Sequence, residues 1–335
     1  MINSDLSEPG YTPHPAPSPL PTASYQGHSY QTGPPIPSQR PHKSRPRPPA
    51  RPEPSSSQAY QEPEYDDIPE VEDFQLSRCT GKKRALCIGI NYTGQPNQLE
   101  GCVNDARNVM SYLIQRRNWP TKAKILSSMK WLVKDAQADD SLFLHYSGHG
   151  GQTRDLDGDE TDGMDELIFP MDYKKNGIIL DDEMHRIMVK PLRPGVRLTA
   201  LFDVRSYLLF GLWIQGFTDS VIFPFFKSDL PYLYHSNGRV KGSQVSAKHF
   251  MKKSTKADVI SFSGCNDSQT SADTIEGGLA VGAMSHAFIS VLKSNPNQSY
   301  QQLLRSVRDI LRKRYSQKPQ LSSSHRIDTT LKFII

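Results

Sequence analysis

Residues 141–151, Ser-Leu-Phe-Leu-His-Tyr-Ser-Gly-His-Gly-Gly, constrain the fold of this chain more than any other stretch. The first half is rich in large apolar residues, which is typical of a buried strand in an α/β sheet. The Ser-Gly-His-Gly sequence predicts a turn, so His149 is expected at the C-terminal end of that strand, where α/β folds bind ligands. An imidazole titrates near neutral pH, which makes His149 a candidate general base. A surface histidine in a glycine turn is the alternative, but an acidic loop follows directly and favours a functional site.

From residue 84 onward, the chain alternates between apolar strands and amphipathic helices. This alternation predicts an α/β fold with a mostly parallel sheet flanked by helices. Strands are expected at 84–90, 166–171, 196–202, 257–262 and 329–335. Helices are expected from Asn104, after a Thr121 cap, over 181–188 behind an Asp181-Asp182 cap, and over 285–292 and 300–315.

The N-terminal quarter has a different composition. Of the 26 prolines, 17 lie in residues 1–75, together with many Ser, Gln and Tyr residues. Such a stretch buries too little apolar surface to offset its ordering entropy, so residues 1–78 are expected to be a disordered proline-rich arm and 79–335 a single folded domain. Prolines interleave a basic run within residues 34–54, which suits binding by a proline-recognising domain better than by nucleic acid.

The cysteines indicate a reducing compartment. The four cysteines show neither metal-ligand spacing nor a disulfide framework, and no apolar segment near residue 1 resembles a secretory signal. We expect a cytoplasmic monomer, with the nucleus as the alternative location. An apolar segment at 204–228 is interrupted by Arg205, Gln215 and Asp219, which argues against a membrane span.

A series of motifs from about residue 80 to the C-terminus resembles the caspase-like domain of fungal type I metacaspases. The motifs include Gly101-Cys-Val-Asn-Asp-Ala, His145-Tyr-Ser-Gly-His-Gly, Asp157-Gly-Asp-Glu, Asp181-Asp-Glu-Met-His and Ser268-Gln-Thr-Ser-Ala-Asp. The resemblance implies a caspase-like fold and a calcium-activated cysteine endopeptidase that cleaves peptides or proteins after Lys or Arg. It also implies a catalytic His–Cys dyad and roles in cell death and proteostasis.

The resemblance assigns the site residues one by one. His149 becomes the general base. The pocket for the basic substrate residue is assigned to Asp105, Ser147 and Asp203. The calcium ligands are assigned to Asp165, Asp181, Asp182 and Asp229, since calcium prefers several oxygen ligands. Two simpler interpretations stay open: Asp181 caps its helix, and Asp105 complements the first turn of its helix.

The nucleophile of the family is missing from its expected place. The family reads Asp-Ser-Cys-His-Ser-Gly, whereas here Asp203 is followed by Val-Arg-Ser-Tyr, and the family pattern resumes only at Asp229. An error of gene model or reading frame over 204–228 is the interpretation we favour, and a divergent pseudo-peptidase that binds basic peptides is the alternative. No cysteine occurs between Cys102 and Cys265, and Cys265 is the nearest candidate substitute.

Two further departures concern the fold. The family has an additional strand between its two early helices, whereas 116–120 joins them directly here. We therefore expect an inner position of the sheet to stay open, with unpaired backbone groups. The segment between the two halves of the domain is also shortened, to 235–256.

Overall fold

The computed structural model describes residues 70–113, 120–206, 230–243, 245–265, 274–276, 279–314 and 318–335. These residues all belong to one compact unit, 61–335. The arm expected at 1–78 therefore lies outside the described residues, except for 70–78.

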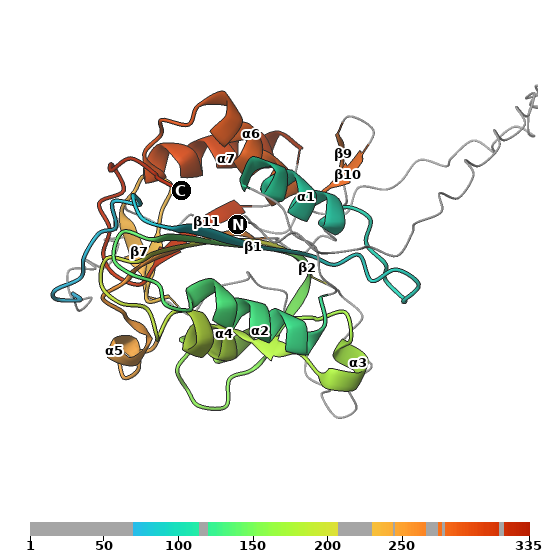
Figure 1. Ribbon diagram of the computed structural model, residues 1–335, viewed down its shortest axis with the longest axis horizontal. Coiled ribbons are helices and arrows are strands. Elements are labelled where there is room, and N and C mark those ends of the chain that lie inside the picture. Colours follow the sequence, from blue (N-terminus) through green and yellow to red (C-terminus); the bar gives the residue numbers. More distant parts are fainter. Residues whose placement is uncertain are drawn as a thin grey trace, which may run out of the picture. The chain divides into compact units, whose positions relative to one another are not determined.

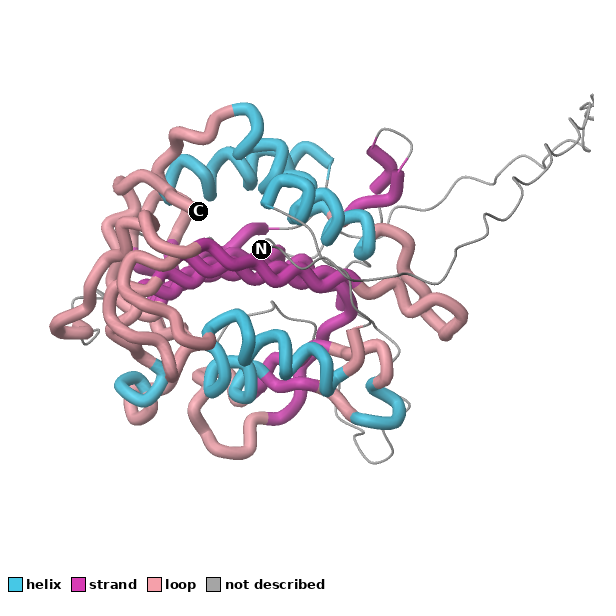
Figure 2. Tube along the Cα trace, viewed as in Figure 1, coloured by secondary structure: helices cyan, strands magenta, loops and turns pink. Residues whose placement is uncertain are grey.

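A mixed sheet runs through the middle of this unit (Figure 1, Figure 2). Its strands follow the order β4-β3-β2-β5-β8-β11-β6-β7, and β1 lies beside β2. The bounds are β1 Lys83–Gly89, β2 Ser141–Arg154, β3 Met164–Ile168, β4 Ile179–Leu180, β5 Arg197–Ser206, β6 Tyr232–Tyr234, β7 Val240–Gly242, β8 Asp258–Cys265 and β11 Lys318–Ser323. The strands β1, β2, β5 and β8 are parallel to one another, as the apolar runs predicted. A separate hairpin is formed by β9 (Thr274–Glu276) and β10 (Leu279–Val281).

Helices cover both faces of the sheet (Figure 1). One face carries α1 (Cys102–Leu113), α6 (Ala283–Ser294) and α7 (Tyr300–Arg314), and the other carries α2 (Lys122–Val133), α3 (Tyr173–Asn176) and α4 (Asp181–Met188). A further short helix, α5, spans Phe250–Lys253. No helix among the described residues combines the length and the apolar character needed to cross a bilayer.

The alternation of side chains along the central strands divides the core in two. Leu144 and Leu198 belong to the core on the α2/α4 face, whereas Phe143 and Leu201 belong to the core on the α1/α6/α7 face. Neighbouring residues of a strand point to opposite faces, so both faces of β2 and β5 are apolar. Leu144 and Leu201 are both 0% exposed, and such burial contributes about 1.5–3 kcal/mol per side chain.

The turn expected around His149 is wrong, because β2 continues through this residue to Arg154. Neither Gly148 nor Gly150 has a positive φ, so the glycines do not reverse the chain. They allow close approach instead: a Cβ atom on Gly150 would overlap the side chain of Val204 and lie 2.9 Å from the carbonyl oxygen of Leu167. Gly150 thus lets strands β5 and β3 pack closely against β2.

The strand expected at 329–335 is also wrong. The last strand is β11, which pairs antiparallel with β8 and β6, so that Leu321 lies opposite both Phe262 and Tyr234. Both edges of β11 are therefore occupied before the chain reaches residue 329. The following segment covers the core instead: the Phe333 ring packs edge-on against Phe262, with centroids 5.8 Å apart.

The open inner position expected in the sheet is absent from its described part. Strand β1 pairs directly with β2, from Lys83 opposite Ser141 to Gly89 opposite Ser147. An additional strand before α2 would therefore extend the sheet beyond β1 and would not fill a gap. The loss of that strand leaves the pairing of the central strands intact.

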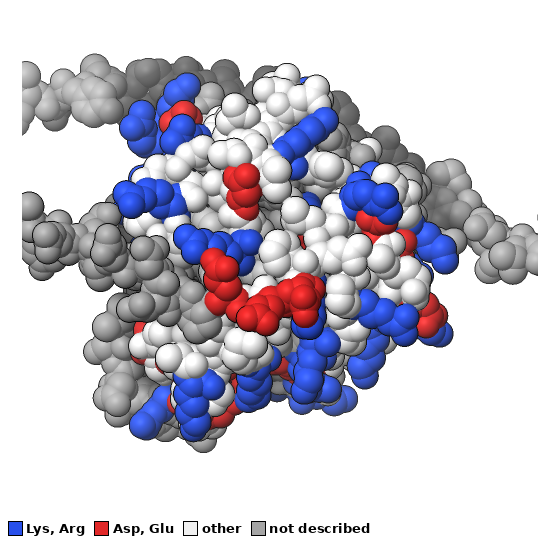
Figure 3. Space-filling model, turned by 90° about the vertical axis from the view of Figure 1, so that its left-hand side faces the viewer, with Lys and Arg blue, Asp and Glu red and all other residues white. Residues whose placement is uncertain are grey.

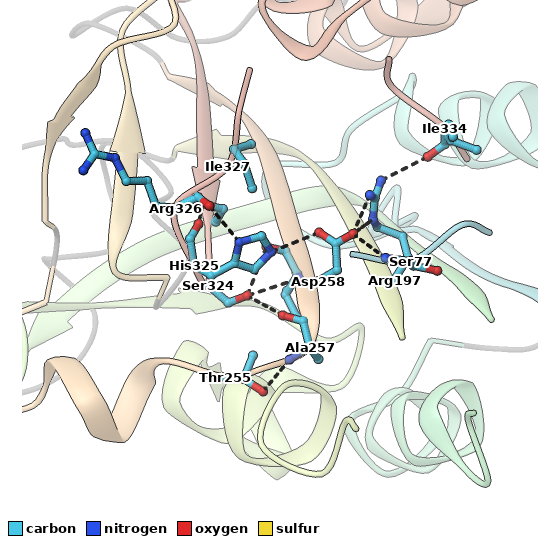
Figure 4. A network of polar contacts seen from close by, with 12 residues as sticks. Ser77, Arg197, Thr255, Ala257, Asp258, Ser324, His325, Arg326, Ile327 and Ile334 are labelled. Carbon is cyan, nitrogen blue, oxygen red and sulfur yellow. Dashed lines mark hydrogen bonds and ion pairs between the residues drawn. The ribbon is translucent and has the colours of Figure 1, made fainter. Parts of the chain in front are cut away.

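Residues 70–79 bind across the edge of the sheet where β5 and β8 begin. The backbone N–H of Ser77 donates to Asp258 Oδ2 (3.2 Å), and the ring of Phe74 stacks on His325 with centroids 3.8 Å apart. Asp258 is fully buried and also accepts hydrogen bonds from Arg197 (2.7 Å) and His325 (3.2 Å), as Figure 4 shows.

The face of the molecule seen in Figure 3 carries exposed charged side chains of both signs.

Candidate active site

His149 lies on β2, only 4% exposed, and is held by aromatic residues. Its ring packs against Tyr92, with centroids 4.4 Å apart, and its backbone N–H donates to the Tyr92 hydroxyl (3.1 Å). The Tyr146 hydroxyl donates to the carbonyl oxygen of His149 (2.7 Å). Burial raises the pKa of Tyr92, so its phenol stays protonated and donates to the carbonyl oxygen of Phe169 (2.6 Å).

The loop after β1 orients the imidazole. Nε2 of His149 lies 2.8 Å from the carbonyl oxygen of Asn97. A carbonyl oxygen can only accept a hydrogen bond, so Nε2 carries the proton and Nδ1 is the basic nitrogen of the neutral ring. Asn97 has a φ of 68°, a left-handed conformation that asparagine tolerates better than most residues. This arrangement suits a general base whose tautomer is fixed by a backbone group.

The register of β2 and β5 defines where a nucleophile would stand. Ser147 pairs with Asp203, and His149 pairs with position 205. Position 205 also has the same parity along the strand as Asp203, so both belong to the same face of the sheet. In the family motif Asp-Ser-Cys, the cysteine comes two residues after the aspartate, which corresponds to position 205 in this chain. Arg205 occupies it here.

The three residues assigned to the basic pocket lie together beneath the start of α6. Ser147 Oγ donates to Asp105 Oδ2 (2.8 Å), and both carboxylates, Asp105 and Asp203, are 1% exposed. The backbone N–H of Gly282 donates to Asp105 (2.6 Å), and that of Ser285 donates to Asp203 (2.8 Å). Asp105 also lies in the first turn of α1, where a carboxylate is favoured, so the simpler interpretation of this residue is compatible with its place beside Ser147.

The four proposed calcium ligands are not brought together as one set. Their region contains three pairs of consecutive acidic residues: 159 and 160, 165 and 166, and 181 and 182. The members of the pair on β3 point to opposite faces, and each belongs to a different triple. One triple is Asp159, Asp165 and Asp182, and the other is Glu160, Glu166 and Asp181; within each, one oxygen of every residue lies within 4.8 Å of the others. We call these six residues the acidic cluster. Asp229 lies outside the described residues.

Asp181 does not cap its helix through its side chain. The N-cap of α4 is Leu180, which makes no side-chain hydrogen bond, and Asp181 is the first helical residue. Its carboxylate accepts from the backbone N–H of Glu166 (3.3 Å) and of Asp182 (3.1 Å). Asp181 therefore links α4 to β3.

Four members of this region were not assigned as site residues from the sequence: Asp159, Glu160, Glu166 and Lys253. Lys253, on α5, is 2% exposed, and its ammonium group forms ion pairs with Asp159 and with Asp182 (2.5 Å). Burial opposes ionisation of Asp159, but hydrogen bonds from Asp157 and Lys253 hold its pKa below the usual range. The acidic loop signalled Asp159 and Glu160, but nothing near Lys253 in the sequence indicated that it would be buried there.

The described cysteines are poorly placed as substitute nucleophiles. Cys102 is fully buried, and burial raises the pKa of Cys87 to about 12, which disfavours its thiolate. Cys265 ends β8, which is separated from β2 by β5. Two strand spacings put its backbone roughly 10 Å from that of β2, whereas position 205 lies directly beside His149.

The architecture and the comparisons define the class of this protein as a caspase-like α/β cysteine peptidase. A solved structure of a Geobacter sulfurreducens protein matches the fold with a TM-score of 0.50 at 23% sequence identity, covering 76% of this chain and 97% of that one. Residues 83–206 match the family model described as metacaspase, peptidase C14 domain.

Similarity to curated fungal proteins extends over most of the chain. Metacaspase-1A of Aspergillus terreus is 46% identical, covering 92% of this chain and 86% of the relative. Metacaspase-1 of Emericella nidulans is also 46% identical, covering 80% of this chain and 76% of the relative. The chain belongs to the metacaspase family.

Proposed function

We propose that this site is that of a cysteine endopeptidase that cleaves after Lys or Arg, with its nucleophile position at residue 205. The observation that carries this proposal is the pairing of His149 with position 205 in the parallel register of β2 and β5. Neighbouring strands are about 4.8 Å apart, which is close enough for a thiol at 205 to reach the imidazole.

The chemistry assigned to the chain's own residues is as follows. Nδ1 of His149 takes the proton of a thiol at position 205, and the thiolate attacks the carbonyl carbon of the scissile peptide bond. The imidazolium then protonates the departing amine, leaving a thioester that water hydrolyses with His149 again acting as the base. Asn97 fixes the tautomer throughout, because its carbonyl oxygen holds the Nε2 proton.

The preference for a basic residue is assigned to Asp105 and Asp203. Ser147, Gly282 and Ser285 donate to these two buried carboxylates, and a guanidinium or ammonium group of the substrate would add charge-assisted hydrogen bonds to the same oxygens. Each charge-assisted bond in such a buried place contributes about 1.5–3 kcal/mol, which is enough to select Lys and Arg over neutral residues.

Calcium is proposed as the activating ion. The residues that would hold it are Asp159, Asp165 and Asp182, with the neighbouring triple that contains Asp181 in support. Their fit rests on the donor set: carboxylate oxygens of two buried residues and the partly exposed Asp182, gathered within 4.8 Å, suit a hard cation with oxygen ligands. When bound, the ion would neutralise the repulsion among these carboxylates. Asp229 is retained as a ligand in the proposal.

The proposal extends to the cell only by family resemblance. We assign the protein to cell death and proteostasis, as a monomer in the cytoplasm or the nucleus. The proline-rich segment 34–54 is proposed as a ligand for a proline-recognising domain. A pull-down with this segment as bait, compared with a variant in which its prolines are replaced by alanine, tests that contact.

The alternative function is a pseudo-peptidase that binds basic peptides without cleaving them. The sequence favours it in one respect, because Arg205 stands where the nucleophile is required. Loss of a nucleophile lowers kcat by about 10⁶-fold in a catalytic triad. Sequencing the spliced transcript separates the two cases: we expect Asp-Ser-Cys-His-Ser-Gly at the site, and a message that encodes 204–228 in frame would favour the pseudo-peptidase.

Restoring the thiol tests the catalytic proposal. The parent should not hydrolyse Arg- or Lys-terminated reporter peptides above background, with or without calcium. Arg205→Cys should introduce a thiol whose alkylation by iodoacetamide persists below pH 7, because His149 stabilises the thiolate. Arg205→Cys/His149→Ala is the matched control and should react only near the pH range of an ordinary thiol. Identical pH profiles for the two variants would show that position 205 does not face the imidazole.

A further inference from the structure

The acidic cluster already contains a cation supplied by the chain itself. Lys253 is 2% exposed, and its ammonium nitrogen forms ion pairs with Asp159 and Asp182. These two aspartates belong to the same triple as Asp165, the one whose oxygens lie within 4.8 Å of one another. The lysine therefore shares two carboxylates with the place assigned to calcium.

The lysine is brought there by a segment that docks on the acidic loop. The backbone N–H of Ser246 donates to the carbonyl oxygen of Asp159 (2.7 Å), and Val245 forms a β-bridge with Glu160. Lys252 lies 3.6 Å from Asp157 at the surface. Residues 245–254, which we call the docking segment, thus contact the loop through backbone groups and through Lys252, and Lys253 of the same segment places a buried charge in the cluster.

Charge and space make the two cations competitors. A buried ammonium group is tolerated only when it is paired, so Lys253 depends on Asp159 and Asp182. A calcium ion coordinated by the same carboxylates at 2.3–2.6 Å would be placed next to the ammonium nitrogen and would repel it. One site of this size cannot hold both charges in contact with the same oxygens.

We infer that Lys253 is an internal occupant of the cation site, and that calcium binding expels its side chain and loosens the docking segment from the acidic loop. This inference rests on the proposed binding of calcium. It couples calcium binding to the attachment of the docking segment, because the ion must displace Lys253 of α5. Calcium coordination alone does not require such a coupling. Calcium affinity is thereby set in part by the chain's own lysine.

Calorimetric titration of the full chain with calcium chloride is the first test. Lys253→Met keeps the length of the side chain and removes the charge, so calcium should bind at least tenfold more tightly than to the parent. Lys252→Met is the matched control, because Lys252 is 59% exposed, and it should leave the affinity unchanged. Equal affinities in all three proteins would overturn the inference while leaving calcium binding intact.

A second measurement uses the parent alone and does not depend on the folding of a variant. Lysines are acetylated with an N-hydroxysuccinimide ester, and the modification of each is quantified by mass spectrometry. Acetylation of Lys253 should be slow without calcium and rise at least tenfold with it, while that of Lys252 stays constant. Protection of Lys253 at saturating calcium would overturn the inference. If neither the parent nor Lys253→Met binds calcium, the proposed calcium site itself is wrong and the inference falls with it.

Discussion

Asp258 and the acidic cluster differ in how their negative charge is neutralised. Asp258 is a single fully buried carboxylate, and it accepts hydrogen bonds from Arg197, His325 and the backbone of Ser77 (Figure 4). The acidic cluster contains six carboxylates, and the ammonium group of Lys253 forms ion pairs with two of them, Asp159 and Asp182.

We therefore expect Asp258 to act in stability and the acidic cluster to act in cation binding. Asp258 connects β8 to β5, to the segment after β11 and to residues 70–79, and its negative charge is matched by local donors. The acidic cluster places several carboxylates close together, where like charges disfavour ionisation, and Lys253 neutralises part of their charge. Substitutions in the two groups should therefore have different consequences for folding and for binding.

Asp258→Ala should have the largest effect on stability. Removing one partner of a buried pair leaves Arg197 buried without its counter-ion, which destabilises by about 3–5 kcal/mol. Urea unfolding followed by circular dichroism measures the loss. A loss of unfolding free energy smaller than about 1 kcal/mol would mean that the hydrogen bonds around Asp258 do not stabilise this edge of the sheet.

Acidification should act on the same carboxylate, with a smaller effect. Burial opposes ionisation of Asp258, but His325 and Arg197 outweigh it and hold its pKa below the ordinary value of 3.8. A depressed folded pKa means that its contribution is complete above the unfolded pKa and is lost as the pH falls through the folded one. Unfolding free energies between pH 6 and pH 3 should decline less steeply in Asp258→Asn than in the parent.

Asp181→Ala/Asp182→Ala should lower the unfolding free energy in a calcium chelator by less than Asp258→Ala does. Lys253 loses its ion pair with Asp182 but keeps the one with Asp159, and relief of like-charge repulsion offsets part of the loss. Calcium should still bind, but more weakly, because the ion can complete its shell from other oxygens. Magnesium should compete poorly. Unchanged calcium heats in calorimetry would place the ion away from Asp181 and Asp182, at the triple of Asp155, Asp157 and Asp159.

Arg78→Ala should have the smallest effect. Arg78 pairs with Asp139 at 2.5 Å, but its side chain is 79% exposed. Solvent and salt screen such a pair, so we expect no measurable change in the urea midpoint. A clear loss of stability would show that residues 70–79 depend on their surface ion pairs and not on Ser77 and Asp258.

The sequence predicted features that depend on local pattern and missed those that depend on distant partners. The buried strands around Leu86, Leu198 and Ile260 followed from short apolar runs, and α7 followed from its helical periodicity. The resemblance assigned Asp105, Ser147 and Asp203 to a substrate pocket; the structure brings them together beside α6, and their role in substrate binding stays a prediction.

The misses have identifiable causes. Gly148 and Gly150 were interpreted as turn residues, because nothing nearby in sequence reveals that Tyr92 would lie against Gly148, or Val204 and Leu167 against Gly150. Strand β11 was missed because its partners, β8 and β6, are far away along the chain. Lys253 carries no local sign of burial, since its counter-ions come from residues 71 and 94 positions earlier, Asp182 and Asp159.

The contact between the pocket and α6 has a consequence for how the pocket can change. The N-cap of α6, Gly282, has no side chain to cap the helix. The N–H groups of Gly282 and Ser285 are bound instead by Asp105 and Asp203, which act as distant caps. Loss of a cap costs about 0.5–2 kcal/mol, and a Cβ atom on Gly282 would lie 2.6 Å from Asp105 Oδ2. Substitution of Asp105 or Asp203, the residues proposed to select basic substrates, should therefore also weaken the start of a core helix.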